Sequence, residues 1–458
     1  MEAPVETRGI IFALGRRVTR RQIVRTGAAG FTGTSALALA ACGSAGGAAS
    51  GGADQSAKPA TIEVWSPEMP VTQATVQDQV IKEFQDKHPN ITAKLAVIPG
   101  GWDPLVEKLQ VSVSGGVQPN TTRLPDNPLR LLIQNKQLMP LDSLIKRDNV
   151  NLKALDKGMI ERGTVDGKLH ILPWSGGILA LYYNQDLFER AGVPLPESTK
   201  AMSWERFVDA ATKVRRLGDD HWGFRIADSF DAPTWSNVKS WLPWLWSNGN
   251  DYFDKTETKP LFGDTKGIAS VQFLTDLVLK HRVANGAKDA RPDQFLGKVG
   301  MWVNQSGDIE TAKTRAPSMR YGTTLIPIGP DGKTSYGPQG GSFIAIAQGA
   351  KDVDQTWRYM RWVTDEEVNL RLVVPAFQDP VHAANQVKPP FSTIPQYKAF
   401  VEQFKTAKAR PGNPIYRPTE DTTAVQIVAA FKGEKTPADA VKTAVDQALS
   451  HIQQYTKK

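Results

Sequence analysis

The chain has 458 residues, more than one hydrophobic core usually organises, so we expect two lobes or domains. Its 40% hydrophobic and 22% charged residues exclude a disordered chain and a polytopic membrane protein. The net charge of +8 falls to +4 without the segment before Cys42, which holds six of the 55 Lys and Arg residues and two of the 47 acids. No basic tract with interleaved aromatic residues occurs in the rest of the chain, so we expect no nucleic-acid partner.

Residues 1–41 have the pattern of an export signal. A basic region around Arg16 and Arg17 precedes a weakly apolar run over 28–41, which is too short and too polar to span a bilayer. Within the basic region, the sequence TRRQIVR, with its pair at Arg20 and Arg21, resembles a twin-arginine export motif. Arginine pairs also occur in signals of the general secretory route, so both export routes stay open.

Cys42 is the only cysteine of the chain, and it directly follows the sequence Leu-Ala-Ala. This arrangement resembles the lipobox of bacterial lipoproteins, in which the cysteine thiol carries a lipid. Residues 42–60 are rich in Gly, Ser and Ala, a composition typical of a flexible linker. We therefore expect a protein anchored through lipid to the outer side of the cell membrane, with no disulfide in the mature chain.

After the linker, the hydrophobic pattern predicts a strand, a helix and a second strand. Residues 61–65 alternate apolar and polar side chains, 75–87 place apolar residues at helical spacing before Pro89, and 91–97 alternate again. Such a unit builds a parallel sheet through a right-handed crossover.

The same alternation continues along the chain and predicts an α/β protein. Further strands are predicted at 169–174, 178–184, 321–328 and 342–347, with a turn at 329–332. Ser203 has the position of a helix cap, and Thr436-Pro437-Ala438-Asp439 is a second strong helix start.

No catalytic motif is present in the sequence. There is no G-x-S-x-G elbow, no phosphate-binding G-x-x-x-x-G-K-[ST] loop and no Cys/His spacing typical of zinc, and the six histidines are scattered. We therefore expect no enzyme activity, no cofactor and no metal. A glycosidase needs only two neighbouring carboxylates, so a secreted glycan-active enzyme stays an alternative.

The aromatic residues favour a binding protein. Among the twelve tryptophans, Trp235, Trp241, Trp244 and Trp246 lie within twelve residues. Indole rings stack on the C–H faces of sugars, and short polar side chains bind sugar hydroxyls, so this composition indicates carbohydrate binding. The same spacing also fits burial inside a helix bundle, and we expect about half of the four to be core residues.

Several motifs support a family resemblance. The segment 84–91, FQDKHPNI, resembles the "EF...HP.I" corner of bacterial extracellular solute-binding proteins of the maltose-binding type. The segments 167–173, GKLHILP, and 181–188, LYYNQDLF, are similar to the "GKLYGLP...LYYNKDLF" signature of that family. The Gly297–Met301 segment, Tyr321-Gly322 and the tail from Asp421 follow in the family's order, so the resemblance covers about 61–455.

The resemblance implies which residues face the ligand. They lie at strand ends and in loops that border the ligand in the family: Trp65, Ser66, Trp102, Asp126, Asn127, Trp174, Ser175, Trp241, Trp244, Asn304, Ser306, Gly340, Gly341, Ser342 and Arg417.

Two departures from the family pattern concern the ligand. The usual Pro-Asp-Val is Pro119-Asn120-Thr121 here, and Gly307 stands where a stacking tryptophan is common. Another tryptophan then supplies the sugar platform, or the ligand is not a typical oligosaccharide. Arg417 could pair with a phosphate or carboxylate, although an exposed arginine is more often a solvated surface group.

The resemblance implies a two-lobe periplasmic-binding-protein fold of type II, in which hinged lobes close over a ligand cleft. We assign 61–174 and 322–368 to lobe 1, and 175–321 and 369–458 to lobe 2. The implied function is capture of a carbohydrate, free or phosphorylated, by a monomer that delivers it to the permease subunits of an ABC importer. A ligand-sensing subunit for a membrane receptor is a further alternative.

Overall fold

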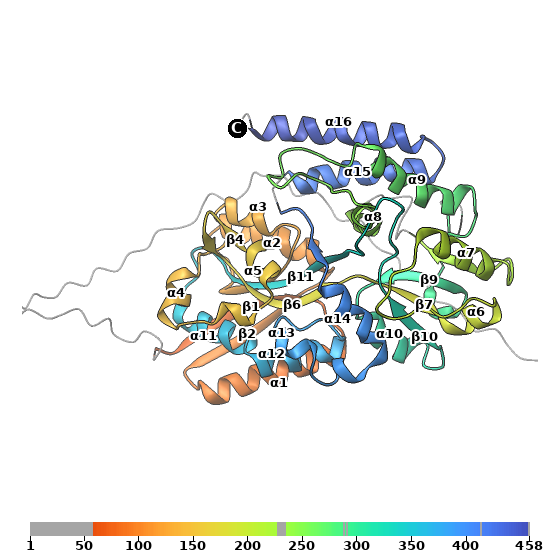
Figure 1. The fold of residues 1–458 in the computed structure, drawn as a ribbon. Coiled ribbons are helices and arrows are strands. Elements are labelled where there is room, and N and C mark those ends of the chain that lie inside the picture. The colour runs from red at the N-terminus through yellow and green to blue at the C-terminus, as the bar shows by residue number, and fades with distance from the viewer. Residues whose placement is uncertain (1–57, 227–234, 287–288, 290–291, 413–414, 457–458) are drawn as a thin grey trace, which may run out of the picture. The chain divides into compact units, whose positions relative to one another are not determined.

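The computed structural model describes residues 58–226, 235–286, 289, 292–412 and 415–456 (Figure 1). The predicted export signal with Arg20 and Arg21, and the predicted lipid anchor Cys42, lie outside these residues. Helices and strands are interspersed along the described chain, and the α/β class is confirmed.

The larger of the sheets has six strands within the described residues. Their order is β12-β11-β3-β1-β2, and β6 also pairs with β11, over Gln339 to Ile344. The strands β1, β2 and β3 are parallel, whereas β11 runs antiparallel to β3 and β6. The bounds are β1 Ala60–Pro67, β2 Ile91–Ile98, β3 Thr121–Pro125, β6 Leu172–Ile178, β11 Gly337–Ile346 and β12 Ala407–Ala409.

A second sheet has the order β10-β7-β9-β8 in the described part of the chain. Its strands are β7 Ala180–Asn184, β8 Trp222–Arg225, β9 Val299–Asn304 and β10 Tyr321–Thr324, and β4 Thr164–Val165 pairs separately with β5 Lys168–Leu169. The β7 strand follows β6 after one residue, so the chain passes directly from the larger sheet to the second one.

Helices cover both sheets (Figure 1). The N-terminal half holds α1 Val71–Lys87, α2 Trp102–Ser114, α3 Leu129–Gln134, α4 Asp142–Arg147, α5 Lys157–Arg162, α6 Gln185–Arg190 and α7 Trp204–Arg215. The later helices are α8 Trp235–Ser247, α9 Thr265–Leu279, α10 Asp308–Arg315, α11 Val353–Val363, α12 Glu366–Val373, α13 Ala383–Gln386, α14 Lys398–Phe404, α15 Tyr416–Phe431 and α16 Pro437–Thr456.

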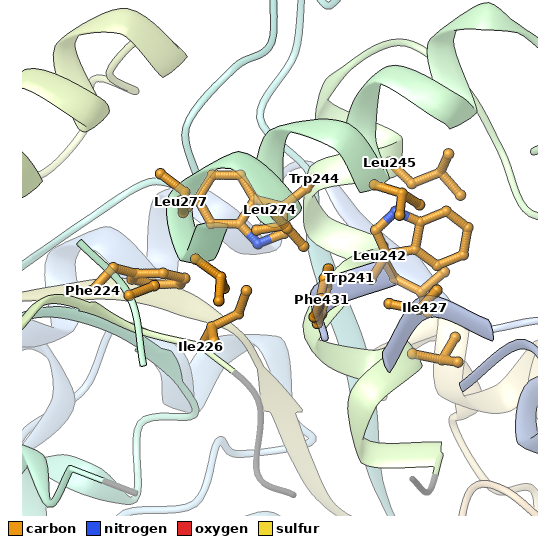
Figure 2. Close-up of a cluster of buried hydrophobic side chains, with 14 of the residues drawn as sticks. Phe224, Ile226, Trp241, Leu242, Trp244, Leu245, Leu274, Leu277, Ile427 and Phe431 are labelled. Atoms are coloured by element: carbon orange, nitrogen blue, oxygen red, sulfur yellow. The ribbon is translucent and has the colours of Figure 1, made fainter. Parts of the chain in front are cut away.

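Each face of each sheet carries its own hydrophobic core. Along β11, Phe343 and Ala345 pack toward α2 and α3, while Ile344 and Ile346 pack toward α1, α11 and α12. This is the two-residue alternation of a strand whose two faces are both covered. In the second sheet, Tyr182 and Trp302 lie on the face covered by α14. Tyr183 and Met301 lie on the opposite face, which is covered by α7, α8, α9, α15 and α16. Figure 2 shows part of the hydrophobic core on this opposite face.

Most predicted elements are confirmed, with changed ends. The parallel strand-helix-strand unit is present, although its helix starts at Val71 because Pro70 precedes the first turn. Ser203 accepts a hydrogen bond from the Arg206 backbone nitrogen and caps α7, and the Thr436 hydroxyl caps α16. The strand predicted at 321–328 ends at Thr324, and the one predicted at 342–347 begins earlier, at Gly337, because it gains partners in β6 and β12.

Strand pairing differs from the predicted lobe limits at three places. The β6 strand continues past residue 174 to Ile178 in the larger sheet, β10 pairs with β7 of the second sheet, and β12, from the tail, joins the larger sheet. Long-range pairing determines which sheet a strand joins, and no local pattern encodes it. The division into two lobes remains a proposal.

Among the residues that the structure describes, no helix is long and apolar enough to cross a membrane.

Candidate functional site

A cavity of about 740 Å³ lies where β3, β6 and β11 of the larger sheet meet the segment after β9 of the second sheet and the start of α15. Slightly more than half of the residues in its wall have hydrogen-bonding side chains, among them Gln110, Asn127, Gln305, Gln339 and Gln378. Trp102, at the start of α2, is the one aromatic residue among the described residues that line it. Many donors and acceptors with one indole suit a small, polar solute.

Nine of the predicted site residues line this cavity: Trp102, Asp126, Asn127, Ser175, Ser306, Gly340, Gly341, Ser342 and Arg417. They come from segments far apart in the chain. Asp126 directly follows β3, Ser175 is in β6, and the glycine pair with Ser342 is in β11. Because β11 lies between β3 and β6, these residues meet on one wall.

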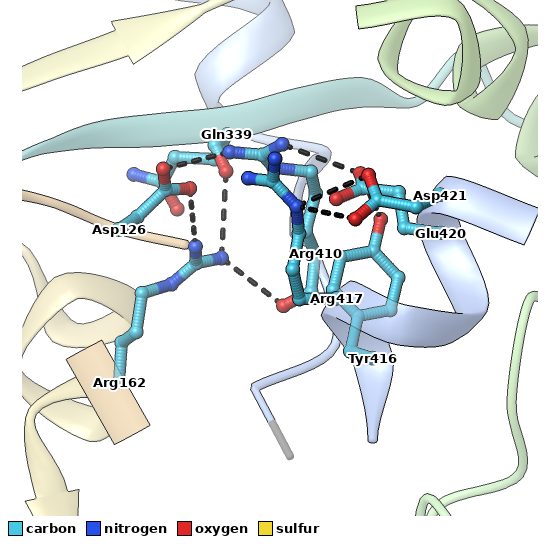
Figure 3. Close-up of polar contacts among 8 residues, drawn as sticks. All are labelled: Asp126, Arg162, Gln339, Arg410, Tyr416, Arg417, Glu420 and Asp421. Carbon is cyan, nitrogen blue, oxygen red and sulfur yellow. Dashed lines mark hydrogen bonds and ion pairs between the residues drawn. The ribbon is translucent and has the colours of Figure 1, made fainter. Parts of the chain in front are cut away.

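Asp126 is the centre of a buried ion-pair cluster (Figure 3). Its carboxylate accepts a hydrogen bond from Arg162 Nη1 at 2.6 Å and one from Arg410 Nη2 at 2.7 Å. The three side chains are only 6–9% exposed. Burial alone would raise the pKa of Asp126, but Arg410 and Arg162 outweigh it and lower that pKa. Asp126 is therefore ionised, and each of its carboxylate oxygens already accepts a hydrogen bond from an arginine.

The cluster extends to α15. Arg410 Nη1 lies 3.5 Å from Glu420 Oε1, and the Tyr416 hydroxyl donates a hydrogen bond to the same oxygen at 2.8 Å. Burial raises the pKa of Glu420 to about 7, although Arg410 and the Tyr416 hydrogen bond act against it. Next to Tyr416, Arg417 Nε donates to the Asp421 carboxylate at 3.0 Å, so Arg417 already has an ionic partner at the cavity wall.

Ser306 joins the cavity to a second buried carboxyl group. Its hydroxyl lies 2.9 Å from Asp379 Oδ1 and 2.8 Å from the Phe377 carbonyl oxygen. Asp379 also accepts hydrogen bonds from the Tyr397 hydroxyl and the Ile178 backbone nitrogen. Burial raises the pKa of Asp379 to about 6. The hydroxyl hydrogen of Ser306 is donated to these protein oxygens. Toward a ligand, the Ser306 oxygen can therefore act only as a hydrogen-bond acceptor.

The structure does not bring the remaining six predicted site residues to the cavity wall: Trp65, Ser66, Trp174, Trp241, Trp244 and Asn304. Trp65 and Trp174 are 3% and 1% exposed and belong to the two cores of the larger sheet. Both faces of that sheet are covered by helices, so a tryptophan near a strand end is buried whichever way it points. Ser66 is also fully buried.

The tryptophans of α8 are core residues (Figure 2). Trp241, Trp244 and Trp246 are at most 1% exposed, which is more than the half that we expected from the sequence. Trp241 Nε1 donates a hydrogen bond to Ser270 Oγ at 2.7 Å, so this indole is satisfied within the core. The helix is buried on several sides by α7, α9 and α15, which explains its many large apolar residues. Trp235 is outside the side chains that can be described.

Asn304 ends β9, and its side-chain oxygen accepts a hydrogen bond from the Gln305 backbone nitrogen. The next residues, Gln305, Ser306 and Gly307, line the cavity in its place.

Sequence reasoning missed several residues of the cavity wall, notably Lys239, Gln305, Gln339 and Arg410. Arg410 follows β12, a strand of three residues that is too short to show a pattern. Gln339 lies directly before the predicted Gly340-Gly341 pair, and a longer predicted strand would have included it.

Comparison with known proteins identifies the family. The model of the family described as "Bacterial extracellular solute-binding protein" matches residues 79–379. The chain belongs to this family.

Two curated relatives and one solved structure illustrate the similarity of this solute-binding protein to known ones. It is 24% identical to the binding protein BAB2_0491 of Brucella abortus (strain 2308). The alignment has 378 residues and covers 81% of this chain and 88% of the relative. It is 22% identical to the lactose-binding protein of Rhizobium radiobacter, over 68% of this chain and 71% of the relative. The structure of UgpB from Mycobacterium tuberculosis in complex with glycerophosphocholine superposes with a TM-score of 0.76 and 17% identity, over 87% and 99% of the two chains.

Family membership settles the class of activity and the fold. The family is extracellular, binds solutes and is non-catalytic, and the mixed α/β fold with two sheets is that of periplasmic binding proteins of the maltose-binding type. Within the described residues, no group of three or more His, Cys, Asp and Glu side chains could hold a metal ion.

Proposed function

We propose that this protein captures a carbohydrate outside the cytoplasm and delivers it to the permease subunits of an ABC importer. The observation that carries the proposal is the cavity wall itself, in which Trp102 offers a stacking face and side-chain amides and hydroxyls offer hydrogen bonds. Relatives named as lactose-binding and sn-glycerol-3-phosphate-binding proteins support two solute classes, a sugar or oligosaccharide and a glycerol phosphate.

Closure of two lobes over the solute is part of this proposal. The cavity wall contains residues from strands of the larger sheet and from the segment after β9 of the second sheet, and these segments belong to different proposed lobes. A solute that contacts both sides would favour the closed form by its differential affinity, and the importer would then recognise that form.

A ligand screen tests the proposed function. We expect at least one of maltose, lactose, an arabino-oligosaccharide or sn-glycerol 3-phosphate to raise the melting temperature of the purified mature protein. A ligand at about one hundred times its Kd stabilises the folded state by about 2.7 kcal/mol, which corresponds to a shift of about 3 °C for a chain of this size. Calorimetric titration then gives the affinity. If no member of a broad sugar and sugar-phosphate library shifts the melting temperature, carbohydrate capture is wrong.

We further propose that the protein is a lipoprotein anchored through Cys42, exported by the twin-arginine route through Arg20 and Arg21, and active as a monomer. The sequence patterns of residues 1–60 support the first two statements.

Two variants should fail at different steps of this maturation. Cys42→Ala should abolish lipid labelling and release the protein from the membrane or block its processing, whereas Ser44→Ala, two residues further on, should behave as the wild type.

Arg20→Lys combined with Arg21→Lys should leave folded precursor in the cytoplasm. Cell fractionation with lipid labelling measures both effects. Lipid labelling of the Cys42→Ala variant would contradict the anchor, and unimpaired export of the double variant would assign the general secretory route.

A further inference from the structure

Arg123, in β3, is a buried cation without a carboxylate partner among the described residues. It is 2% exposed, and its guanidinium nitrogens hydrogen bond to two neutral hydroxyls, Ser66 Oγ at 3.4 Å and Ser342 Oγ at 3.2 Å. The guanidinium carbon lies 4.5 Å from the ring centre of Trp174 and 5.5 Å from that of Trp102. Burial lowers the pKa of Arg123 to about 9, so the group still carries its charge at neutral pH.

The other arginines near the cavity behave differently. Arg162 and Arg410 are also buried, and both pair with Asp126. Arg417 is partly exposed and pairs with Asp421. A desolvated charge usually has a counter-charge, because an uncompensated one lowers the stability of the fold. Arg123 lies one side chain behind the cavity wall, where a ligand could supply that counter-charge.

Ser342 and Ser175 connect Arg123 to the cavity. Their hydroxyl oxygens are 2.8 Å apart, and both residues line the wall. Arg123 already donates to Ser342 Oγ, and the serine pair holds two hydroxyl hydrogens, of which one is used between them. Within the described part of the chain, the other hydrogen is donated to no acceptor. Whichever serine donates to its neighbour, the pair has one donor left to offer to the cavity.

We infer that the bound solute carries an anionic oxygen, of a phosphate or a carboxylate, which accepts a hydrogen bond from the Ser175 and Ser342 pair, with Arg123 as the positioning residue behind them. This inference rests on the proposed carbohydrate function. A neutral sugar hydroxyl would need only the serine donor, whereas a buried positive charge favours an anion selectively.

The other charges of the wall agree with this assignment. Asp126 is occupied by two arginines, and Asp103 and Glu107 are exposed residues of α2, where water screens their charge. Lys239 adds a further positive charge to the wall.

Matched ligand pairs test the inference. The pairs are glucose with glucose 6-phosphate, glucose with glucuronate, and glycerol with sn-glycerol 3-phosphate, titrated calorimetrically at fixed ionic strength. We expect the wild type to bind the anionic member of at least one pair about tenfold or more tightly than the neutral member. The phosphate and carboxylate pairs identify which anion is preferred.

Variants assign that preference to Arg123. Arg123→Met and Ser342→Ala should each reduce the anionic-to-neutral affinity ratio about tenfold, and Arg123→Lys, which keeps the charge, should retain most of it. Arg371→Met is the matched control, because it removes a positive charge that pairs with Glu83 on the surface, away from the cavity. The control should leave the ratio unchanged. If Arg123→Met does not fold, Ser342→Ala and Arg123→Lys decide.

Two results would overturn the inference and differ in their consequences. A wild type that binds neutral and anionic members equally removes the anionic group. A ratio that Ser342→Ala and Arg123→Met leave unchanged removes the role of Arg123 and the serine pair. Both results keep carbohydrate capture. A wild type that binds no member of any pair and no other sugar overturns both the inference and the proposed function.

Discussion

Replacing Trp174 by alanine is expected to lower the free energy of unfolding of the ligand-free protein by about 3–5 kcal/mol. The indole is 1% exposed and packs in the core between the larger sheet and α1, α11 and α12. Alanine would leave a cavity there and would also remove the aromatic face that lies 4.5 Å from the Arg123 guanidinium. Urea denaturation of the ligand-free variant at pH 7 measures the loss.

Trp102 is the matched control for this variant, because its ring also faces Arg123 but lines the cavity. Trp102→Ala should change the free energy of unfolding by about 1 kcal/mol or less and weaken the best ligand roughly tenfold or more. The opposite result, an unchanged stability of the Trp174→Ala variant together with a large loss of ligand affinity, would return Trp174 to the ligand site.

These two tryptophans show why the sequence predicts the fold better than the site. Local patterns determine the elements: the alternation over 61–65 and 91–97, the Ser203 cap and the Thr436 cap each depend on neighbouring residues and are all present. The family motifs then indicate how these elements connect. Whether a tryptophan at a strand end lines a cavity depends on which helices cover the two faces of the sheet, and no local pattern contains that information.

The charged cluster illustrates the same limit. Asp126 was predicted at the ligand site, and it does line the cavity, but both of its carboxylate oxygens are bound by arginines. Its partners, Arg162 and Arg410, are 36 and 284 residues away in the sequence. An ion pair between such distant residues forms only after the sheet is assembled, so sequence alone identified the carboxylate and missed the cations that occupy it.

Arg410 should therefore contribute strongly to stability, and we expect Arg410→Met to lower the free energy of unfolding by about 3–5 kcal/mol at pH 8. The side chain is 6% exposed and lies 2.7 Å from Asp126 and 3.5 Å from Glu420. Methionine fills a similar volume but leaves Asp126 with Arg162 as its one remaining arginine partner, and Glu420 with the Tyr416 hydroxyl. Urea denaturation at pH 8 measures the loss.

The loss should shrink at low pH, because protonation removes the charge that the variant leaves unpaired. Burial already raises the folded-state pKa of Glu420 to about 7, above its ordinary value, and the loss of Arg410 raises it further. An acid whose pKa is raised in the folded state stabilises the fold below its ordinary pKa and loses that contribution as pH rises through the folded-state pKa. The destabilisation of Arg410→Met should thus be smaller at pH 5.5 than at pH 8.

Arg410→Met combined with Glu420→Gln should recover about 1 kcal/mol or more at pH 8 and little at pH 5.5, since glutamine cannot ionise. An equal loss at both pH values, with no recovery in the double variant, would show that Arg410 acts through packing and not through its charge.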